Sequence, residues 1–266
     1  ARLSFTPSFL DFLQQTYSIS PFSVDFKHRN PSVHQQINRY VSTHTLEQIP
    51  QLLSPNTLPL NTQLFLLNTL YFKADWESPF RSEATYTSPF YQTPSISITA
   101  NMMVQNNSFL YYETPHFQAV QCDYDTSPFS MLFVLPKAAL SSSLKTLSPD
   151  FISQFQTAAK REPCVLHLPR FKTRSRLSLK QSLNKLGMSA LFRSDIVYPY
   201  ISDLPLPLFN LFHQVVIDID ESGTTAAAAT GGVISTTSFN PNKKIMIFNK
   251  PFLYFLIHRP SQLILV

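Results

Sequence analysis

The sequence has only four glycines and two cysteines among its 266 residues. So few glycines exclude a collagen-like chain, and two cysteines exclude a disulfide-rich scaffold. Cys122 and Cys164 form no CxxC motif and match no metal-ligand spacing. We therefore expect two separate, partly buried thiols, with one disulfide as the alternative, and we expect no metal and no cofactor.

Long hydrophobic runs are also missing. No uninterrupted apolar run reaches the roughly 18 residues of a membrane helix, so we expect no membrane contact. The chain is still 44% hydrophobic and only 14% charged, which excludes intrinsic disorder and predicts a soluble domain with a real core. The start "ARLSFTPSFL" has neither an initiator Met nor the plan of a signal peptide, and the end "SQLILV" stops within an apolar strand pattern. We therefore expect a chain cut from something longer.

Charge is sparse and of mixed sign, with a net value of +5. The densest basic segment is "RFKTRSR" (170–176), whose cations alternate and would line one face of a strand. A solvated strand edge is one interpretation, and binding of a polyanion such as a glycosaminoglycan is the alternative. We expect no nucleic-acid partner. Asn106 begins the sequence's one N-glycosylation sequon, "NNS", which matters if the protein is secreted.

Three segments have helical spacing. Residues 7–19 form the first, and residues 32–53 form the second, with Val33, Ile37, Tyr40 and Val41 on one face. The third is 177–192, where Leu179, Leu183 and Leu186 follow helical spacing up to Gly187.

Strand patterns alternate irregularly with these helices. The run Thr62–Phe72 is almost continuously apolar and predicts a strand buried on both faces. Asn68 lies inside it, and because an unpartnered buried amide costs roughly 1–3 kcal/mol, it predicts a specific hydrogen-bond partner. Further strands are predicted at 129–135, 164–168, 213–220 and, around a turn at 249–251, within 245–257. This order favours an α+β domain with antiparallel or mixed sheets.

The stretch "DESGTTAAAATGGVISTTSF" (220–239) contains three of the four glycines. No charged side chain occurs from Thr224 to Asn242, and one face with a period of two carries Thr224, Ala226, Ala228 and Thr230. Either face could enter a sheet without the cost of several kcal/mol for burying an ion. The segment is therefore compatible with an exposed loop, with an added strand, or with a simple flexible linker.

Together with its neighbours, this stretch resembles the reactive-centre loop of a serpin. "DESGTTAAAAT" resembles the family's hinge, "NTLYFKADWESPF" and "FNKPFLYFLI" resemble two of its strand segments, and "MMVQ", "FSMLFVLP", "LPRFK" and "LNKLGMSALF" follow in the family's order. The resemblance covers essentially the whole chain and is nearest to the extracellular, antitrypsin-like branch. It implies one serpin domain over 1–266, incomplete in its first helices and the end of its last strand, with three β-sheets surrounded by helices.

The resemblance implies a serine protease inhibitor rather than an enzyme, and no GxSxG or HExxH motif argues otherwise. A serine protease would cleave the exposed loop, which then inserts into the main sheet of a metastable fold and traps the acyl-enzyme. The resemblance further implies a secreted, extracellular, monomeric glycoprotein with Asn106 as the glycosylated residue. The alternatives are a non-inhibitory serpin that carries a hormone or another small ligand, and an inactive truncated copy.

The resemblance also assigns roles to single residues. Glu221 and Gly223 match the hinge, while Thr224, Ala226, Ala228 and Thr230 match the residues that face inward after insertion. Asn68 and His213 match the shutter pair, and Trp76 matches the tryptophan at the breach where insertion begins. Counting from Gly223 puts the reactive bond at Thr237-Ser238, with Thr236, Phe239 and Asn240 as neighbouring candidates. A Thr or Phe at the cleaved bond favours an elastase-like or chymotrypsin-like protease.

Some positions depart from the family's pattern. Ala74 follows "YFK" where the family usually has glycine, and Thr225 stands where an acidic residue is common. Gly231 and Gly232 are unusual in the distal hinge, and each would cost roughly 0.5–1 kcal/mol more than alanine when ordered into a strand. We expect slower insertion from these glycines. We also expect the incomplete chain on its own to aggregate and to inhibit poorly.

Overall fold

The computed structural model describes residues 4–28, 30–54, 57–224 and 243–266. These form two compact units, which we treat separately: unit 1 comprises Ala1–Tyr71 and Thr173–Val216, and unit 2 comprises Phe72–Lys172 and Ile217–Val266. Ala226, Ala228, Thr230, Thr237 and Ser238 lie outside the described residues. No helix in the described part of the chain combines the length and the apolar character needed to cross a membrane.

Unit 1 combines helices with two long strands that pair in parallel. Its elements are α1 (Pro7–Tyr17), α2 (Asn30–His44), β1 (Leu64–Tyr71), α5 (Lys180–Lys185), the 3-10 helix η3 (Ser189–Phe192), most of β8 (Phe171–Ser178) and most of β9 (Leu208–Ile219). The predicted helix at 7–19 is confirmed as α1. The helix predicted at 177–192 is confirmed only in part, because the α-helical residues are limited to α5 and the segment after Gly187 forms the 3-10 helix η3.

The second predicted helix is wrong in its extent, because α2 ends at His44 rather than continuing to residue 53. Leu46 and Glu47 adopt positive φ angles of 49° and 62°, which a helix cannot contain. The Thr45 hydroxyl accepts a hydrogen bond from the Ile49 backbone N–H at 3.2 Å and so stabilises the turn. The following residues pack into the core of unit 1, whose buried members are Val41, Ile49, Leu52, Leu53, Leu58 and Val216.

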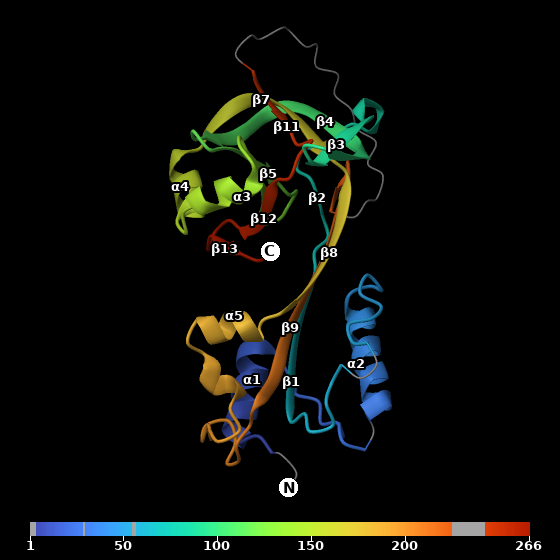
Figure 1. Cartoon of the computed structure of the whole chain (residues 1–266), viewed down its shortest axis with the longest axis vertical. Coiled ribbons are helices and arrows are strands. Elements are labelled where there is room, and N and C mark those ends of the chain that lie inside the picture. Colours follow the sequence, from blue (N-terminus) through green and yellow to red (C-terminus); the bar gives the residue numbers. More distant parts are fainter. Residues whose placement is uncertain (1–3, 29, 55–56, 225–242) are drawn as a thin grey trace. The chain divides into compact units, whose positions relative to one another are not determined.

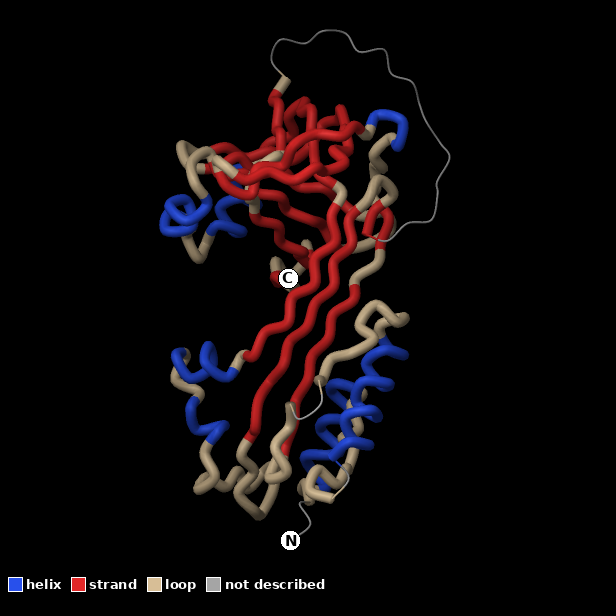
Figure 2. The backbone as a smooth tube through the Cα atoms, turned by 45° about the vertical axis from the view of Figure 1, so that its right-hand side comes forward, coloured by secondary structure: helices blue, strands red, loops and turns tan. Residues whose placement is uncertain are grey.

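Strands β1 and β9 lie side by side (Figure 1, Figure 2). Their register sets Asn68 opposite His213. The strand predicted at Thr62–Phe72 is confirmed, but its burial on both faces is wrong, because Leu66 is 44% exposed and Asn68 is also exposed. In the described residues, the core of unit 1 covers the Leu67 side of β1. The prediction that the Asn68 amide is buried therefore fails.

Unit 2 consists mainly of strands. They are β2 (Ala74–Asp75), β3 (Tyr86–Thr93), β4 (Ile96–Glu113), β5 (Phe117–Asp123), β6 (Phe129–Pro136), β7 (Lys160–Pro169), β10 (Gly223–Thr224), β11 (Lys244–Ile247), β12 (Leu253–His258) and β13 (Leu263–Ile264). The helical segments are η1 (Ser82–Ala84), α3 (Leu140–Ser143), η2 (Leu144–Thr146) and α4 (Phe151–Ala158). The strands predicted at 129–135, 164–168 and 245–257 are confirmed as β6, β7, β11 and β12.

The large sheet of unit 2 has the order β11-β7-β4-β5-β6-β12-β13, and β3 also pairs with β4. Its strands are antiparallel except for the parallel β11–β7 pair, which confirms the α+β class with mixed sheets. The described residues form two hydrogen-bonded sheets in total rather than three. The reason is β4, whose first half pairs with β3 and whose last residues pair with β5, so that one long strand joins what would otherwise be two sheets.

The core of unit 2 lies beneath α4 and along β5 and β6. Cys122 and Cys164 are both buried free thiols, as the sequence predicts. Burial raises the pKa of both, and that of Cys164 rises to about 11. Thiols with such raised pKa values are protonated at neutral pH, which makes them poor nucleophiles.

Candidate functional site

The hinge predicted from the sequence is a tight antiparallel hairpin in unit 2. Strand β9 ends at Ile219, and Asp220 then turns the chain, because its Oδ1 atom accepts hydrogen bonds from the N–H groups of Ser222 (2.9 Å) and Gly223 (3.2 Å). After the turn Thr224 pairs antiparallel with Ile219. Both residues of β10 also pair with β2: Gly223 pairs with Asp75, and Thr224 pairs with Ala74. We call residues 220–224 and the side chains that contact them the hinge site.

Gly223 lies where two backbones meet. A Cβ atom at this position would lie 2.2 Å from the Ala74 carbonyl oxygen and 2.6 Å from the Cα atom of Asp75. Both neighbours are backbone atoms in a paired strand, so neither can move aside without breaking the β10–β2 pairing. The glycine that the family resemblance assigns to the hinge is therefore required here by close packing.

Glu221 is a buried carboxylate held at the turn by an ion pair with Arg170, whose side chain is 48% exposed. Its side chain is only 8% exposed and accepts hydrogen bonds from the Arg170 guanidinium at 2.6 and 2.7 Å and from the Thr85 hydroxyl at 2.7 Å. Burial raises the pKa of Glu221, but the hydrogen bonds from Arg170 and Thr85 outweigh this effect and leave the pKa below its ordinary value. The carboxylate is thus ionised at neutral pH and fixes the turn to the end of β7.

Trp76 and Tyr124 form the aromatic wall of the hinge site. Trp76 is 3% exposed, and its indole N–H donates to the Asp220 carbonyl oxygen at 3.0 Å. The two rings stack with centroids 4.5 Å apart at an angle of 11°. The Tyr124 hydroxyl is hydrogen-bonded to Thr224 Oγ1 at 2.8 Å, and burial raises the pKa of Tyr124. Two of the side chains assigned from the sequence, Trp76 and Thr224, therefore meet through a third that was not assigned.

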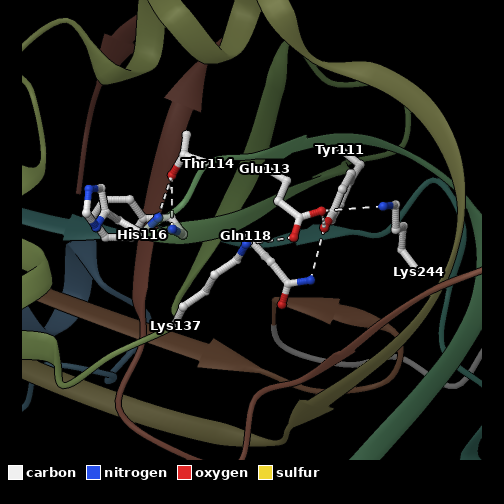
Figure 3. Close-up of polar contacts among 8 residues, drawn as sticks. Tyr111, Glu113, Thr114, His116, Gln118, Lys137 and Lys244 are labelled. Atoms are coloured by element: carbon white, nitrogen blue, oxygen red, sulfur yellow. Dashed lines mark hydrogen bonds and ion pairs between the residues drawn. The ribbon is translucent and has the colours of Figure 1, made fainter.

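A second polar cluster lies in unit 2 at the start of strand β11. Lys244 is the first residue of β11, and its Nζ atom lies 3.4 Å from Glu113 Oε2 (Figure 3). The Nζ atom of Lys137 lies 2.7 Å from Oε1 of the same carboxylate. The Tyr111 hydroxyl donates to Glu113 Oε2 at 2.7 Å. The hydrogen bond from Lys137, with that from Tyr111, lowers the pKa of Glu113 to about 2. Glu113, at the end of β4, thus links β4 directly to β11 through Lys244, although these two strands are separated in the sheet by β7.

The shutter pair predicted from the sequence lies in unit 1. Asn68 and His213 are register partners on β1 and β9. Asn68 is exposed and His213 is half-buried, and among the described residues no hydrogen bond joins their side chains. The strand register therefore places the two residues opposite each other without a hydrogen bond between their side chains.

Sequence reasoning missed several residues that hold the hinge site. Arg170 was identified only as part of a basic segment. No pattern in the sequence marked Tyr124 or Thr85 as part of the hinge site. Arg170 could have been found, because a cation at the end of a strand is a natural partner for a buried Glu. The remaining cations of that segment, Lys172, Arg174 and Arg176, are exposed on β8 as the alternation predicts.

Comparisons with known proteins agree on one family. The serpin family model, described as serine protease inhibitor, matches residues 1–266. Human antithrombin-III is 30% identical over 275 residues, covering 99% of this chain and 58% of its own length. Leukocyte elastase inhibitor A of Mus musculus is 29% identical over 274 residues, covering 98% of this chain and 72% of its own length. A solved thyroxine-binding globulin complex with thyroxine has a TM-score of 0.87 and 25% identity, covering 99% of this chain and 70% of that one.

Proposed function

Because this chain belongs to the serpin family, we propose that the protein inhibits a serine protease as a suicide substrate and is not an enzyme. Cleavage would occur at Thr237-Ser238, and the freed segment after Thr224 would insert between β1 and β9. The chain spans 58% of the length of antithrombin-III, so this proposal concerns the whole natural protein. We propose further that this protein is a secreted, extracellular monomer with one serpin domain.

The strand register at the hinge is the observation that carries the proposal. Thr224 pairs antiparallel with Ile219, and continuing this register by six residues brings Thr230 opposite His213. Thr224 also pairs antiparallel with Ala74, and continuing that register brings Thr230 opposite Asn68. The two independent registers agree, because Asn68 and His213 are themselves partners. An inserted strand would thus lie in register with both neighbours.

The residues that would face inward fit this position. In the continued register Ala226 lies opposite Ile217 and Ala228 lies opposite Val215, both of which are buried, as is Thr224. Small uncharged side chains can enter such positions without desolvation of a charge. We propose that Asn68 and His213 act as the shutter by closing on the Thr230 hydroxyl, which would give the exposed Asn68 amide a partner. We propose Trp76 as the breach residue on the basis of its contact with Asp220.

The proposed target is an elastase-like or chymotrypsin-like protease. A threonine at the cleaved bond, or Phe239 nearby, lacks the cation that a trypsin-like pocket requires. The similarity to a leukocyte elastase inhibitor supports the same choice. The exposed cations Arg174 and Arg176 of β8 remain a candidate site for a glycosaminoglycan.

A carrier of a small ligand is the second candidate function, because a thyroxine-binding globulin complex is among the similar solved structures. The inward-facing residues argue for inhibition over this alternative. A carrier does not need a segment that can be buried as a strand, whereas this segment has only Thr and Ala at its inward positions.

The first experiment is to mix the full-length natural protein with elastase-like, chymotrypsin-like and trypsin-like proteases. We expect a covalent complex that survives denaturing electrophoresis with one of the first two classes. Mass spectrometry of the released C-terminal peptide should show Ser238 as its first residue. Because insertion adds on the order of ten hydrogen bonds of about 1 kcal/mol each, we expect cleavage to raise Tm by roughly 20 °C. Cleavage without a complex and without a rise in Tm would contradict inhibition and favour the carrier.

The lowered pKa values of two carboxylates predict how the stability of the native protein depends on pH. Glu113 and Glu221 both have pKa values below the ordinary 4.5, with that of Glu113 at about 2. Their contribution to the free energy of unfolding is therefore complete above pH 4.5 and is lost as the pH falls toward their folded pKa values. We expect denaturant unfolding to show stability decreasing from pH 5 to pH 3, and Glu221→Gln to cost about 1–3 kcal/mol at pH 7 and to flatten this decrease. An unchanged profile in Glu221→Gln would contradict the role of its ion pair.

A further inference from the structure

Three strands of unit 2 present one continuous outer face. Strands β4, β7 and β11 lie side by side (Figure 1), and their registers align Asn106 with Val165 and Val165 with Ile245. The next row, two residues away along each strand, contains Val104, His167 and Ile247. Residues aligned across neighbouring strands point to the same side of a sheet, so these six side chains share one face.

This face is solvent-exposed and largely apolar. Ile245 is 60% exposed and Ile247 is 41% exposed, whereas Leu166 and Met246, which point to the opposite face, are fully buried. Burial lowers the pKa of His167, which is therefore neutral at pH 7. The two rows thus carry no charge at neutral pH. Exposed isoleucines side by side on a strand at the end of a sheet favour aggregation.

Asn106, the sequon asparagine, is the one member of these rows with an amide side chain. Its side chain is exposed, as is that of Ser108, the hydroxyl residue of the sequon. Within the described part of the chain neither side chain is recorded in a hydrogen bond with another group. Asn107 between them is engaged, since its Oδ1 atom accepts from the Ser108 N–H at 2.8 Å. The acceptor amide is therefore accessible and uncommitted, and it lies directly beside the apolar row.

We propose that Asn106 carries an N-linked glycan whose sugars cover Val165 and Ile245, a role that rests on the secretion proposed above. The asparagine Nδ2 atom forms a bond to the anomeric carbon of an oligosaccharide supplied as a lipid diphosphate. The bond from that carbon to the diphosphate oxygen breaks, the lipid diphosphate leaves, and the amide proton passes to a base. Asn106 and Ile245 are two strand spacings apart, about 10 Å, a distance that a branched glycan of several sugars spans.

Four variants of the secreted, full-length protein test this inference. Asn106→Gln and Ser108→Ala destroy the acceptor sequence, whereas the matched controls Asn107→Gln and Ser108→Thr keep it. We expect enzymatic deglycosylation to remove the mass of a glycan at Asn106 from the wild type and both controls, and to remove none there from the first two variants. We also expect Asn106→Gln to increase the fluorescence of a hydrophobic dye about twofold, and Ile245→Lys added to it to reverse that increase.

Either of two results would overturn the inference. One is a peptide map in which Asn106 of the secreted protein is unmodified. The other is a glycan at Asn106 whose removal leaves dye binding and aggregation unchanged, which would mean that the sugars do not cover the face. The protease gel assay on the same variants keeps this result separate from the proposed function, because complexes can form with or without the glycan.

Discussion

Ala226→Arg is expected to abolish the proposed inhibition and to leave the protein a plain substrate of the protease. In the continued register this side chain lies opposite Ile217, which is fully buried. A guanidinium buried there without a partner costs several kcal/mol, and about 3 kcal/mol would slow insertion roughly 100-fold. Insertion competes with deacylation, so we expect at least about 100 times more cleaved inhibitor per covalent complex. Electrophoresis of reactions with an elastase-like or chymotrypsin-like protease measures this ratio.

Thr225→Arg is the matched control for this prediction. The same register sets Thr225 opposite Asp218, which is partly exposed and ion-paired with Lys172 at 2.7 Å. An added cation on this face can stay in water and lies near a carboxylate, so we expect the stoichiometry of inhibition to change less than about threefold. If the two variants inhibit equally well, the register argument fails, and with it the assignment of the inward-facing residues.

Much of the hinge site could be predicted from the sequence because its chemistry is local. The glycine, the small uncharged run and the acidic turn lie within a few residues of one another. The resemblance then assigned Trp76, which the structure joins to the hinge by a hydrogen bond to Asp220. Strand periodicity was equally informative for β6 and β7, since each strand's pattern depends only on its own residues.

The contacts that fix the hinge could not be predicted, because they join residues far apart in sequence. Arg170 and Glu221 are separated by 51 residues, and Tyr124 and Thr224 by 100. Nothing in either local pattern states which strand will bring the partner. The predicted burial of Asn68 failed for a related reason. An apolar run indicates a strand, but whether both faces of that strand are covered depends on the other segments that pack against it.

In the proposed mechanism, insertion would extend the native hinge rather than dissolve it. The turn at Asp220 and the pairs of Thr224 with Ile219 and Ala74 already set the direction and register of the strand that would follow. Opening the β1–β9 ladder, with its Asn68–His213 row, would be the remaining barrier to the proposed insertion. Substitutions at the turn should therefore affect native stability, and substitutions beyond it should affect inhibition.

Gly223→Ala tests the first half of that division and should have the largest effect on stability. The new methyl group would meet the Ala74 carbonyl oxygen at 2.2 Å, and relief requires separation of β10 from β2. Loss of that pairing would also disturb Trp76, whose backbone N–H donates to the Ser222 carbonyl oxygen at 2.8 Å. We expect a loss of at least about 3 kcal/mol in the free energy of unfolding, measured by denaturant titration of the uncleaved protein.

Gly187→Ala separates this packing effect from the general cost of replacing a glycine. Gly187 has a φ of +84°, but a Cβ atom there would meet nothing within 4 Å. Its replacement should therefore cost only the strain of a left-handed backbone, about 1–2 kcal/mol. Fluorescence of Trp76, the one tryptophan of these 266 residues, should change in Gly223→Ala and stay the same in Gly187→Ala. Equal losses of stability in the two variants would mean that the approach of β10 to β2 is looser than the structure shows and that Gly223 serves the hinge by flexibility alone.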